Sequence, residues 1–435
     1  MVKSRKHMIK EIVRELYPLY RTLVHNDTDK ALKMIGSRIP ASAKYSIECY
    51  APMSRAWTWQ VPPRYEVDEA YIELEDGRRV ADFNLNPMHL VSYSVPIQKR
   101  MTWDELKTHL HYSEKIPSAI PWQYAYYVKE WGFSLTKNEY DRLPRKGRFH
   151  VVIRAKFITA AKKGLKVGIA RLSSGPRHDK QSGDLIICGH IDHPYQANDG
   201  LSGVAVAVEI ARRLVSRPLP EGSSAIRFLF CPETIGSICY LSHHKEVVKR
   251  LKAGIFIEMA GNRNSLVLQK SWQGDHKIDR IARYVLRRLE PGFREGAFLK
   301  VVGNDEKVIN GPGVDVPCIS ISRYPYKEYH TSADNMDIIH EDRLQKTVDV
   351  VEEIARIFAS DYIPRRKFTG PAFLTRYGLW VSPKEDAAIN ANIYLIMQHF
   401  DGKNSVFNIA EKLDLEYWKT RDYIERFIAC GLVSR

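Results

Sequence analysis

Apolar positions recur at two different spacings along this chain, and the change of spacing divides it. From Ile9 to Tyr20 they recur every three or four residues, which predicts an amphipathic helix. The same spacing returns from about Asp27 and stops before Pro40, which predicts a second helix. We therefore expect residues 1–48 to form helices that pack on a larger core.

Residues 49–150 contain short apolar runs that are broken by proline and glycine. Residues 71–83 are typical of two strands joined at Asp76-Gly77, because glycine tolerates the positive φ of a tight turn. This segment predicts a small, inserted β-domain. It also holds many aromatic residues, including Trp57, Trp59, Trp103, Trp122, Trp131 and the run 124–127. We expect these rings mainly to fill the core of the β-domain; the alternative is that some of them line a substrate cleft.

Residues 151–364 alternate apolar runs with amphipathic segments, which is typical of an α/β layer fold. The run 185–188 has no polar alternation, as in a strand buried on both faces. Together these features predict a mixed, largely parallel sheet flanked by helices. The expected strands are 149–153, 184–188, 225–231, 253–258 and 316–322, and the expected helices are 202–214, 278–289 and 344–359.

Residues 365–435 show three helix-like runs, at about 384–399, 405–412 and 416–429, with the size and spacing of a winged helix-turn-helix. Lys419 and Arg421 begin the third run, but Glu416, Asp422 and Glu425 dilute their charge. A nucleic-acid partner is therefore disfavoured. We expect this region to contact a protein, to self-associate or to cap the active site.

Composition excludes several classes of protein. Hydrophobic residues make up 44% of the 435 residues, so most of the chain is folded, and no sequence repeat is present. No apolar run approaches the roughly 20 residues that span a bilayer. The start of the chain lacks an unbroken apolar stretch, and the six cysteines form no CxxC pair. We expect a cytoplasmic protein without disulfides, without a membrane partner and with a solvated basic surface, since the net charge is 66 − 51 = +15.

Residues able to bind a metal follow one predicted strand after another. His190 and Asp192 follow the strand at 184–188, Glu233 follows the strand at 225–231, and Glu258 ends the strand at 253–258. Asp199 precedes a helix, and His330 follows the last strand. Ligands of α/β sheets bind outside the carboxyl ends of strands, and imidazole and carboxylate are the groups that bind catalytic zinc. The pattern therefore favours a metal-dependent hydrolase, in which one further carboxylate moves a proton from water to the leaving amine.

In this order the motifs resemble the zinc aminopeptidases with two co-catalytic metals. The resemblance implies that His190, Asp199 and Glu258 hold one zinc and that Asp192 orients the imidazole. It implies that Asp199 and His330 belong to a second zinc site, and that Glu233 is the general base. Over the whole chain the sequence is similar to aminopeptidase-like proteins associated with polysaccharide biosynthesis loci, which add an inserted β-domain and a C-terminal winged helix. The segments that carry this likeness are 57–62, 93–96, 120–124, 131–133, 232–237 and 329–332.

One departure from the family pattern concerns the second metal. The family has two adjacent glutamates where this chain has Glu233-Thr234, so a ligand is missing. His193 is an extra ligand in one interpretation and a hydrogen-bonding histidine in the other. Thr234 either offers a weak oxygen or leaves room for water. We expect one bound zinc, and the sequence leaves open whether a second zinc binds.

The substrate is less well defined by the sequence. Arg323 is a candidate clamp for a substrate carboxylate, with a structural ion pair as the alternative, and Tyr329 is a candidate substrate contact. The leading hypothesis is a zinc-dependent hydrolase of the aminopeptidase type, acting on a small peptide or an amide-containing metabolite. The alternatives are a deacylase or cyclase in polysaccharide or natural-product biosynthesis, and a non-catalytic regulator or scaffold that uses its winged helix.

Overall fold

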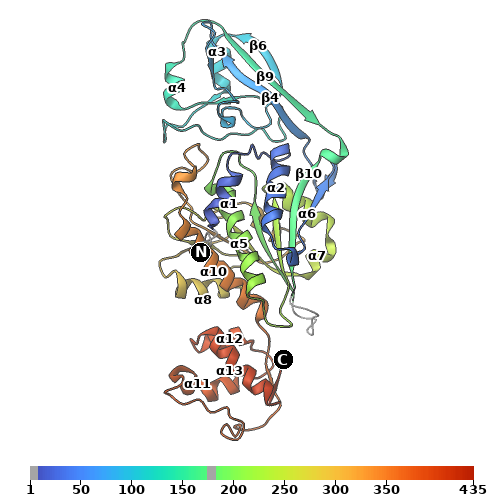
Figure 1. Ribbon diagram of the computed structural model, residues 1–435, viewed down its shortest axis with the longest axis vertical. Helices are drawn as coiled ribbons and strands as arrows, with labels where there is room; N and C mark the ends of the chain where they lie inside the picture. Colours follow the sequence, from blue (N-terminus) through green and yellow to red (C-terminus); the bar gives the residue numbers. More distant parts are fainter. Residues whose placement is uncertain (1–7, 174–182) are drawn as a thin grey trace, which may run out of the picture.

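The computed structural model describes residues 8–173 and 183–435, so the charged start of the chain lies outside the described residues. Three parts follow one another along the long axis of the molecule (Figure 1). A small sheet lies at one end, a large α/β layer lies in the middle, and the C-terminal helices lie at the other end.

The large sheet has eight strands in the order β1-β10-β12-β11-β13-β16-β14-β15. Its centre, β12-β11-β13-β16, is parallel, whereas β1, β10 and β14 join through antiparallel pairs. This confirms the mixed α/β fold. The strands are β1 (Ser46–Tyr50), β10 (Leu165–Leu172), β11 (Asp184–His190), β12 (Ile226–Cys231), β13 (Leu251–Ile257), β14 (Val267–Gln269), β15 (Arg294–Gly296) and β16 (Cys318–Ser322).

Helices cover both faces of this sheet. Every residue of β11 is buried, as the unalternating run predicts. Gly203 lets α5 approach β13 closely, because a Cβ at this position would lie 2.0 Å from the carbonyl oxygen of Ile257. The helices of this part are α1 (Ile9–Leu16), α2 (Asn26–Arg38), α5 (Gly203–Ser216), α6 (Ile235–His243), α7 (Lys245–Arg250), α8 (Lys277–Leu289), α9 (Asp305–Ile309) and α10 (Glu341–Ser360).

Helix α1 is shorter than its spacing predicts. It ends at Leu16, whereas the apolar spacing runs on to Tyr20. Pro18 explains the difference, since a proline has no N–H to continue the helical hydrogen bonds and its ring clashes with the preceding turn.

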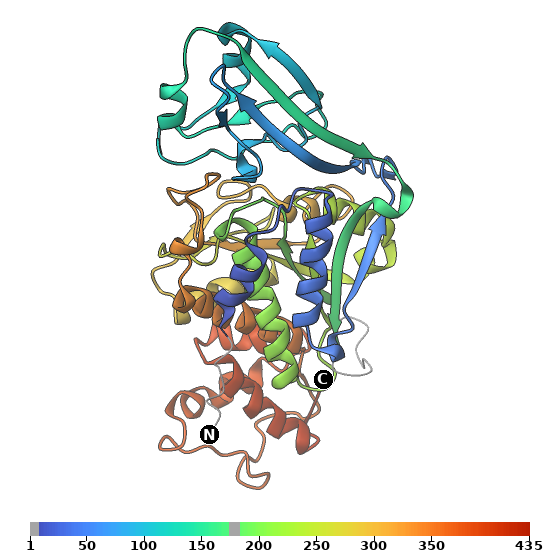
Figure 2. The same cartoon turned by 45° about the horizontal axis from the view of Figure 1, so that its top comes forward.

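The small sheet has the order β5-β4-β9-β6, and all of its pairs are antiparallel. Figure 2 shows the two long strands β4 and β9 side by side, with β9 leading back to β10 of the large sheet. The hairpin between β4 and β5 turns at Asp76-Gly77, as predicted, and Gly77 has φ +82°. The elements are β2 (Arg55–Ala56), β3 (Trp59–Gln60), β4 (Arg64–Glu73), β5 (Arg79–Val80), β6 (Ile97–Met101), α3 (Trp103–Leu106), β7 (Leu110–His111), β8 (Phe133–Ser134), α4 (Lys137–Arg142) and β9 (Phe149–Ile158).

One strand belongs to a different sheet from the one expected. The strand predicted at 149–153 is part of β9, which pairs with β4 and β6 in the small sheet and not with the α/β core. Apolar alternation identifies a strand but not its partners. Conversely, β1 and β10 belong to the large sheet, and β10 was not expected from the sequence.

The C-terminal part contains α11 (Ala387–Gln398), α12 (Val406–Lys412) and α13 (Tyr417–Ala429), close to the three predicted runs. Its two short strands, β17 (Arg365–Arg366) and β18 (Val433–Ser434), pair with each other. The winged helix-turn-helix interpretation of this region stays a prediction. Within the described residues, no helix is both long enough and apolar enough to cross a bilayer.

Candidate metal centre and pocket

The predicted metal ligands converge at one edge of the large sheet. The parallel strands β12, β11, β13 and β16 place their carboxyl ends along this edge. His190 ends β11, Glu258 directly follows β13, and Glu233 follows β12 by two residues. Because parallel strands end together, residues that are far apart in sequence meet here.

His190 lies at the centre of a first cluster of polar atoms. Its Nε2 lies 3.2 Å from Asp199 Oδ1 and 3.5 Å from Glu258 Oε2. Its other ring nitrogen, Nδ1, lies 3.3 Å from Asp192 Oδ1. Asn304 donates a hydrogen bond of 2.5 Å to Glu258 Oε2 from the pocket side.

A second cluster forms around the other oxygen of Asp199. Asp199 Oδ2 lies 3.2 Å from His193 Nδ1 and 3.1 Å from His330 Nε2. The second nitrogen of His193, Nε2, lies 3.1 Å from Glu233 Oε2. Asp199 therefore stands between two groups of three side chains: His190, Asp199 and Glu258, and His193, Asp199 and His330.

Several atoms of these clusters are buried and lack a hydrogen bond despite their short separations. They are His190 Nε2, His193 Nδ1, Asp199 Oδ2, Glu258 Oε1 and His330 Nε2. Buried polar atoms are normally paired, and buried charges are normally paired or bound to a metal. Burial raises the pKa of Glu258 to about 8, so ionisation of this carboxyl is favoured when positive charge is added beside it. The donor set of imidazole nitrogens and carboxylate oxygens fits a zinc ion.

The backbone around the site is strained at several positions. Thr234 has φ +62° and ψ −63°, and the Ile235 N–H donates to the Glu233 carbonyl at 2.6 Å, which is a rare γ-turn. His193 (φ +73°) and His330 (φ +56°) also have positive φ. Such conformations cost on the order of 1–3 kcal/mol each and persist when surrounding contacts hold them.

Three buried charged residues hold these loops in place. Asp305 accepts hydrogen bonds from the Thr234 N–H at 3.0 Å and from the Ser237 hydroxyl at 2.5 Å. Asp334 accepts from the N–H groups of Asn198 and Asp199 at 2.6 and 3.0 Å. Asp192 accepts from the Glu233 N–H at 2.7 Å, so it is bonded to both His190 and the backbone of the candidate base.

Arg21 supports the loop that carries Asp192 and His193. Its buried guanidinium donates to the carbonyl oxygens of Ile191, Asp192 and Gln196 at 2.6, 3.0 and 3.1 Å. Burial lowers the pKa of Arg21 to about 10, but the side chain remains charged at neutral pH. The sequence pattern does not point to Arg21, because no motif surrounds this residue. Asp334 was detectable, since it follows His330 at the family's spacing.

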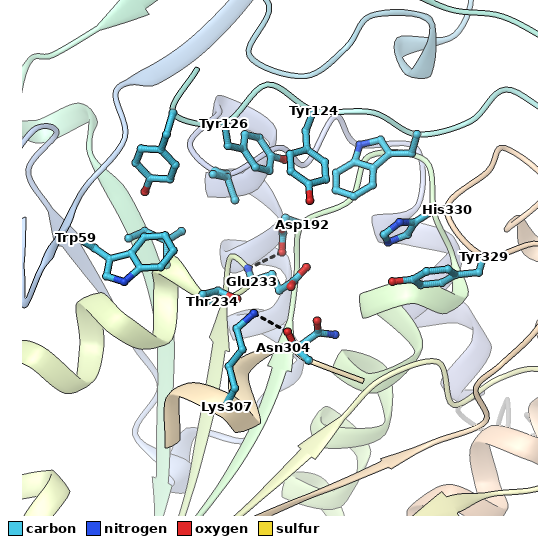
Figure 3. Close-up of a pocket in the computed structure, with 15 residues that line it drawn as sticks. Trp59, Tyr124, Tyr126, Asp192, Glu233, Thr234, Asn304, Lys307, Tyr329 and His330 are labelled. Carbon is cyan, nitrogen blue, oxygen red and sulfur yellow. Dashed lines mark hydrogen bonds between the residues drawn. The ribbon is translucent and has the colours of Figure 1, made fainter. Parts of the chain in front are cut away.

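A cavity of about 500 Å³ opens above the clusters, between the large sheet and the small-sheet part (Figure 3). Asp192, Glu233 and Thr234 lie at its centre, and Tyr329 stacks on His330 with ring centres 3.8 Å apart. The residues that line it are Leu23, Trp59, Trp122, Tyr124, Tyr126, Tyr127, Asp192, Glu233, Thr234, Ile235, Gly303, Asn304, Lys307, Tyr329 and His330.

Part of the aromatic segment lines this pocket, contrary to the expectation that these rings mainly fill a core. Trp59, Trp122 and residues 124, 126 and 127 face the cavity, whereas Trp103 and Trp131 pack against other rings of the small-sheet part. The backbone N–H of Trp122 donates to the His330 carbonyl at 2.8 Å, which joins the aromatic segment to the loop that carries His330. For Trp59, Trp122 and residues 124, 126 and 127, the alternative expectation therefore holds: these rings line a cleft.

Two further expectations are corrected. Arg323 is fully buried and does not line the pocket; its guanidinium donates to the carbonyls of Ala260, Asn264 and Arg343. It is therefore a structural residue and not a substrate clamp. No described C-terminal residue lines the pocket, and α12 and α13 contact α8 and α10 instead, through pairs such as Arg280 with Glu411. The C-terminal part therefore does not cap this site.

Comparison with known proteins places the chain in a family. The family described as domain of unknown function DUF4910 matches residues 10–361. A protein of Clostridium acetobutylicum is 30% identical over 416 residues, which cover 94% of this chain and 92% of that protein. That relative is provisionally named a polysaccharide biosynthesis protein with an aminopeptidase-like domain.

Solved structures show the same fold. A crystal structure from Clostridium acetobutylicum, provisionally described as a peptidase, matches with a TM-score of 0.81 and 28% identity, covering 98% of this chain and 95% of that one. A zinc aminopeptidase of Bacillus subtilis matches with a TM-score of 0.60 and 16% identity, covering 80% of this chain and 93% of that one. A peptidase M28 precursor of Shewanella amazonensis matches with a TM-score of 0.56 and 14% identity, covering 81% of this chain and 93% of that one. The chain thus has the fold of the zinc aminopeptidases, and it belongs to the DUF4910 family.

Proposed function

We propose that this protein is a metal-dependent hydrolase that cleaves an amide bond with water. The observation that carries the proposal is the convergence of buried, unbonded imidazole nitrogens and carboxylate oxygens at the edge of the sheet. Hydrogen bonding does not account for these atoms, whereas metal ligation would satisfy all of them at once.

The first metal would be held by His190 Nε2, Asp199 and Glu258. Asp192 would fix the imidazole through Nδ1, and Asn304 would fix the Glu258 carboxylate. Partners of this kind select the tautomer and the orientation of the ligating group. Zinc is the metal that this donor set favours, and the aminopeptidase fold supports it.

The second metal would be held by the other oxygen of Asp199 and by His330. In this chain, His193 would supply the ligand that is lost at Thr234. The geometry supports this role, because His193 Nδ1 points at the same oxygen as His330 Nε2 and neither nitrogen has a hydrogen bond.

Glu233 would act as the general base. Its carboxylate lies in the pocket beside the clusters, and the bond from its N–H to Asp192 fixes its backbone (Figure 3). When bound, zinc supplies Lewis acidity to the substrate carbonyl and lowers the pKa of water. Glu233 takes the proton from the attacking water as the new C–O bond forms, and it gives that proton to the leaving nitrogen as the C–N bond breaks. The products are one carboxylic acid and one amine.

The substrate would be a small peptide or an amide-containing metabolite. A relative whose name places it in polysaccharide biosynthesis supports a metabolite, and the peptidase description of a solved structure supports a peptide. A cavity of about 500 Å³ accepts either of them, because it lies within the usual size range of small-molecule sites.

Metal analysis of the purified protein, combined with Glu233→Gln, tests the proposal. We expect bound zinc, and a loss of at least 100-fold in hydrolysis by the variant with unchanged zinc content, since general-base catalysis contributes about 10²–10⁴-fold. Glu246→Gln, on the exposed surface of α7, is the matched control and should change neither quantity. Zinc-free protein, or full activity after Glu233→Gln, would refute this mechanism.

A further inference from the structure

Among the described residues, the pocket above the clusters offers a substrate ammonium no carboxylate beyond those assigned to the metal site and to the general base. Among its described lining residues the only acids are Asp192 and Glu233. Asp192 accepts the Glu233 N–H through Oδ1 and its Oδ2 is buried away from the cavity, while Glu233 Oε2 lies 3.1 Å from His193 Nε2. At the position where the resemblance to the zinc aminopeptidases implies a second glutamate as a metal ligand, this chain has neutral Thr234, so this position adds no negative charge to the pocket. An unpaired ammonium would therefore be desolvated here without compensation.

The same pocket contains a positively charged side chain, Lys307. Lys307, on α9, lines the pocket, and its amine donates to the carbonyl of Gly303 at 2.5 Å beside Asn304 (Figure 3). It forms no ion pair with any carboxylate in the described part of the chain. A lysine in this position repels an ammonium group and favours an anion, and a hydrogen bond to a charged partner is stronger than a neutral one.

The opposite wall presents open aromatic faces. Trp59, Tyr124 and Tyr127 are 42%, 54% and 53% exposed, although they line a pocket. Trp59 and Tyr127 meet edge to face at 5.9 Å, and Tyr124 stacks on Tyr126 at 4.7 Å, so the rings support one another. Exposed aromatic faces of this kind pack well against a flat ring.

We propose that the substrate is an acylated amide without a free ammonium, which carries a ring with an apolar face, aromatic or sugar, and an anionic group. The ring packs on Trp59, Tyr124 and Tyr127, and the anion, a carboxylate or a phosphate, is received by Lys307. This inference rests on the proposed function for the position of the scissile amide. It separates the protein from an aminopeptidase in the strict sense, because the described pocket residues offer a substrate amine no acid beyond Asp192 and Glu233.

Binding and hydrolysis of matched probes by the zinc-loaded protein test the inference. N-acetylphenylalanine and phenylalaninamide share one ring, but only the first is acylated and anionic. N-acetylglucosamine 1-phosphate offers a sugar ring and a phosphate. By calorimetry we expect at least one anionic probe to bind ten times more tightly than phenylalaninamide. The tighter of the two anionic probes shows whether the ring of the substrate is aromatic or a sugar. Equal or tighter binding of phenylalaninamide would overturn the inference.

Variants locate the anion site. Lys307→Met should weaken the preferred anionic probe about tenfold and should not weaken phenylalaninamide, because the lysine repels its ammonium group. Trp59→Ala should weaken every probe with a ring. Lys300→Met, outside the pocket, is the matched control. An unchanged affinity in Lys307→Met overturns the anion assignment. Binding of an acylated probe without hydrolysis would count against the proposed function alone, whereas preferred hydrolysis of phenylalaninamide would count against this inference alone.

Discussion

At the scale of single residues, one replacement changes the electrostatics of the site. By the resemblance to the zinc aminopeptidases, Thr234 stands at the position of a second glutamate, and the imidazole of His193 approaches the same centre from another loop, with Nδ1 3.2 Å from Asp199 Oδ2. The second metal site would then have one anionic ligand, Asp199, which it shares with the first. Because less negative charge faces the second ion, we expect it to be held more weakly than the first.

His193→Ala tests this assignment. The variant should retain about one equivalent of zinc while the wild type binds about two, because only the second cluster loses a ligand. Zinc titration by calorimetry and the absorption spectrum of the cobalt-substituted protein measure this without reference to activity. His243→Ala, on α6 and outside both clusters, is the control and should bind as the wild type does. Two tight equivalents in His193→Ala would contradict the ligand role.

At the scale of elements, close packing between α5 and β13 positions the bridging carboxylate. Asp199 lies in the segment Asn198–Ser202 that leads into α5, and Glu258 directly follows β13, so the packing of this helix on this strand helps to set the distance between the two candidate ligands. Gly200, with φ +87°, allows the turn before the helix to cross His190; a Cβ there would lie 2.8 Å from the imidazole Cε1. Gly200 and Gly203 therefore both help to set the geometry of the site.

Gly203→Ala should destabilise the protein although alanine is the better helix former. The added methyl would collide with the Ile257 carbonyl, and forced overpacking costs about 1–3 kcal/mol. Urea denaturation measures the change in the free energy of unfolding. The control is Gly292→Ala, where an added Cβ meets nothing within 4 Å and the backbone is not left-handed. Equal stability of the two variants would show that α5 has room to move.

At the scale of the whole molecule, the site joins parts of the chain that are distant in sequence. The ligand candidates extend from His190 to His330, Arg21 reaches the site from the segment after α1, and Trp122 reaches it from the small-sheet part. Opening the fold would separate all of these groups. Metal binding should consequently stabilise the entire α/β layer and not only one loop.

Zinc should raise the thermal unfolding midpoint of the wild-type protein, and a chelator should lower it. A ligand at 100 times its Kd adds about 2.7 kcal/mol to the stability of the folded state. In Asp199→Asn the shift should disappear, since both clusters lose their shared carboxylate. Asp349→Asn, on the exposed side of α10, should keep the full shift. A zinc-independent midpoint in the wild type would mean that the clusters bind no metal.

The sequence alone determined the α/β class, the buried central strand and the polar residues that meet at the strand ends, because these depend on local apolar spacing and on the common direction of parallel strands. Only the tertiary structure decided the rest. It assigned β9 to the small sheet, buried Arg323 among backbone carbonyls, and brought Arg21 to the loop that carries Asp192. It also turned Trp59 and Tyr124 toward the pocket above the candidate metal ligands. Each of these outcomes depends on contacts between residues far apart in the chain, and a local pattern of apolar and polar positions carries no information about such contacts.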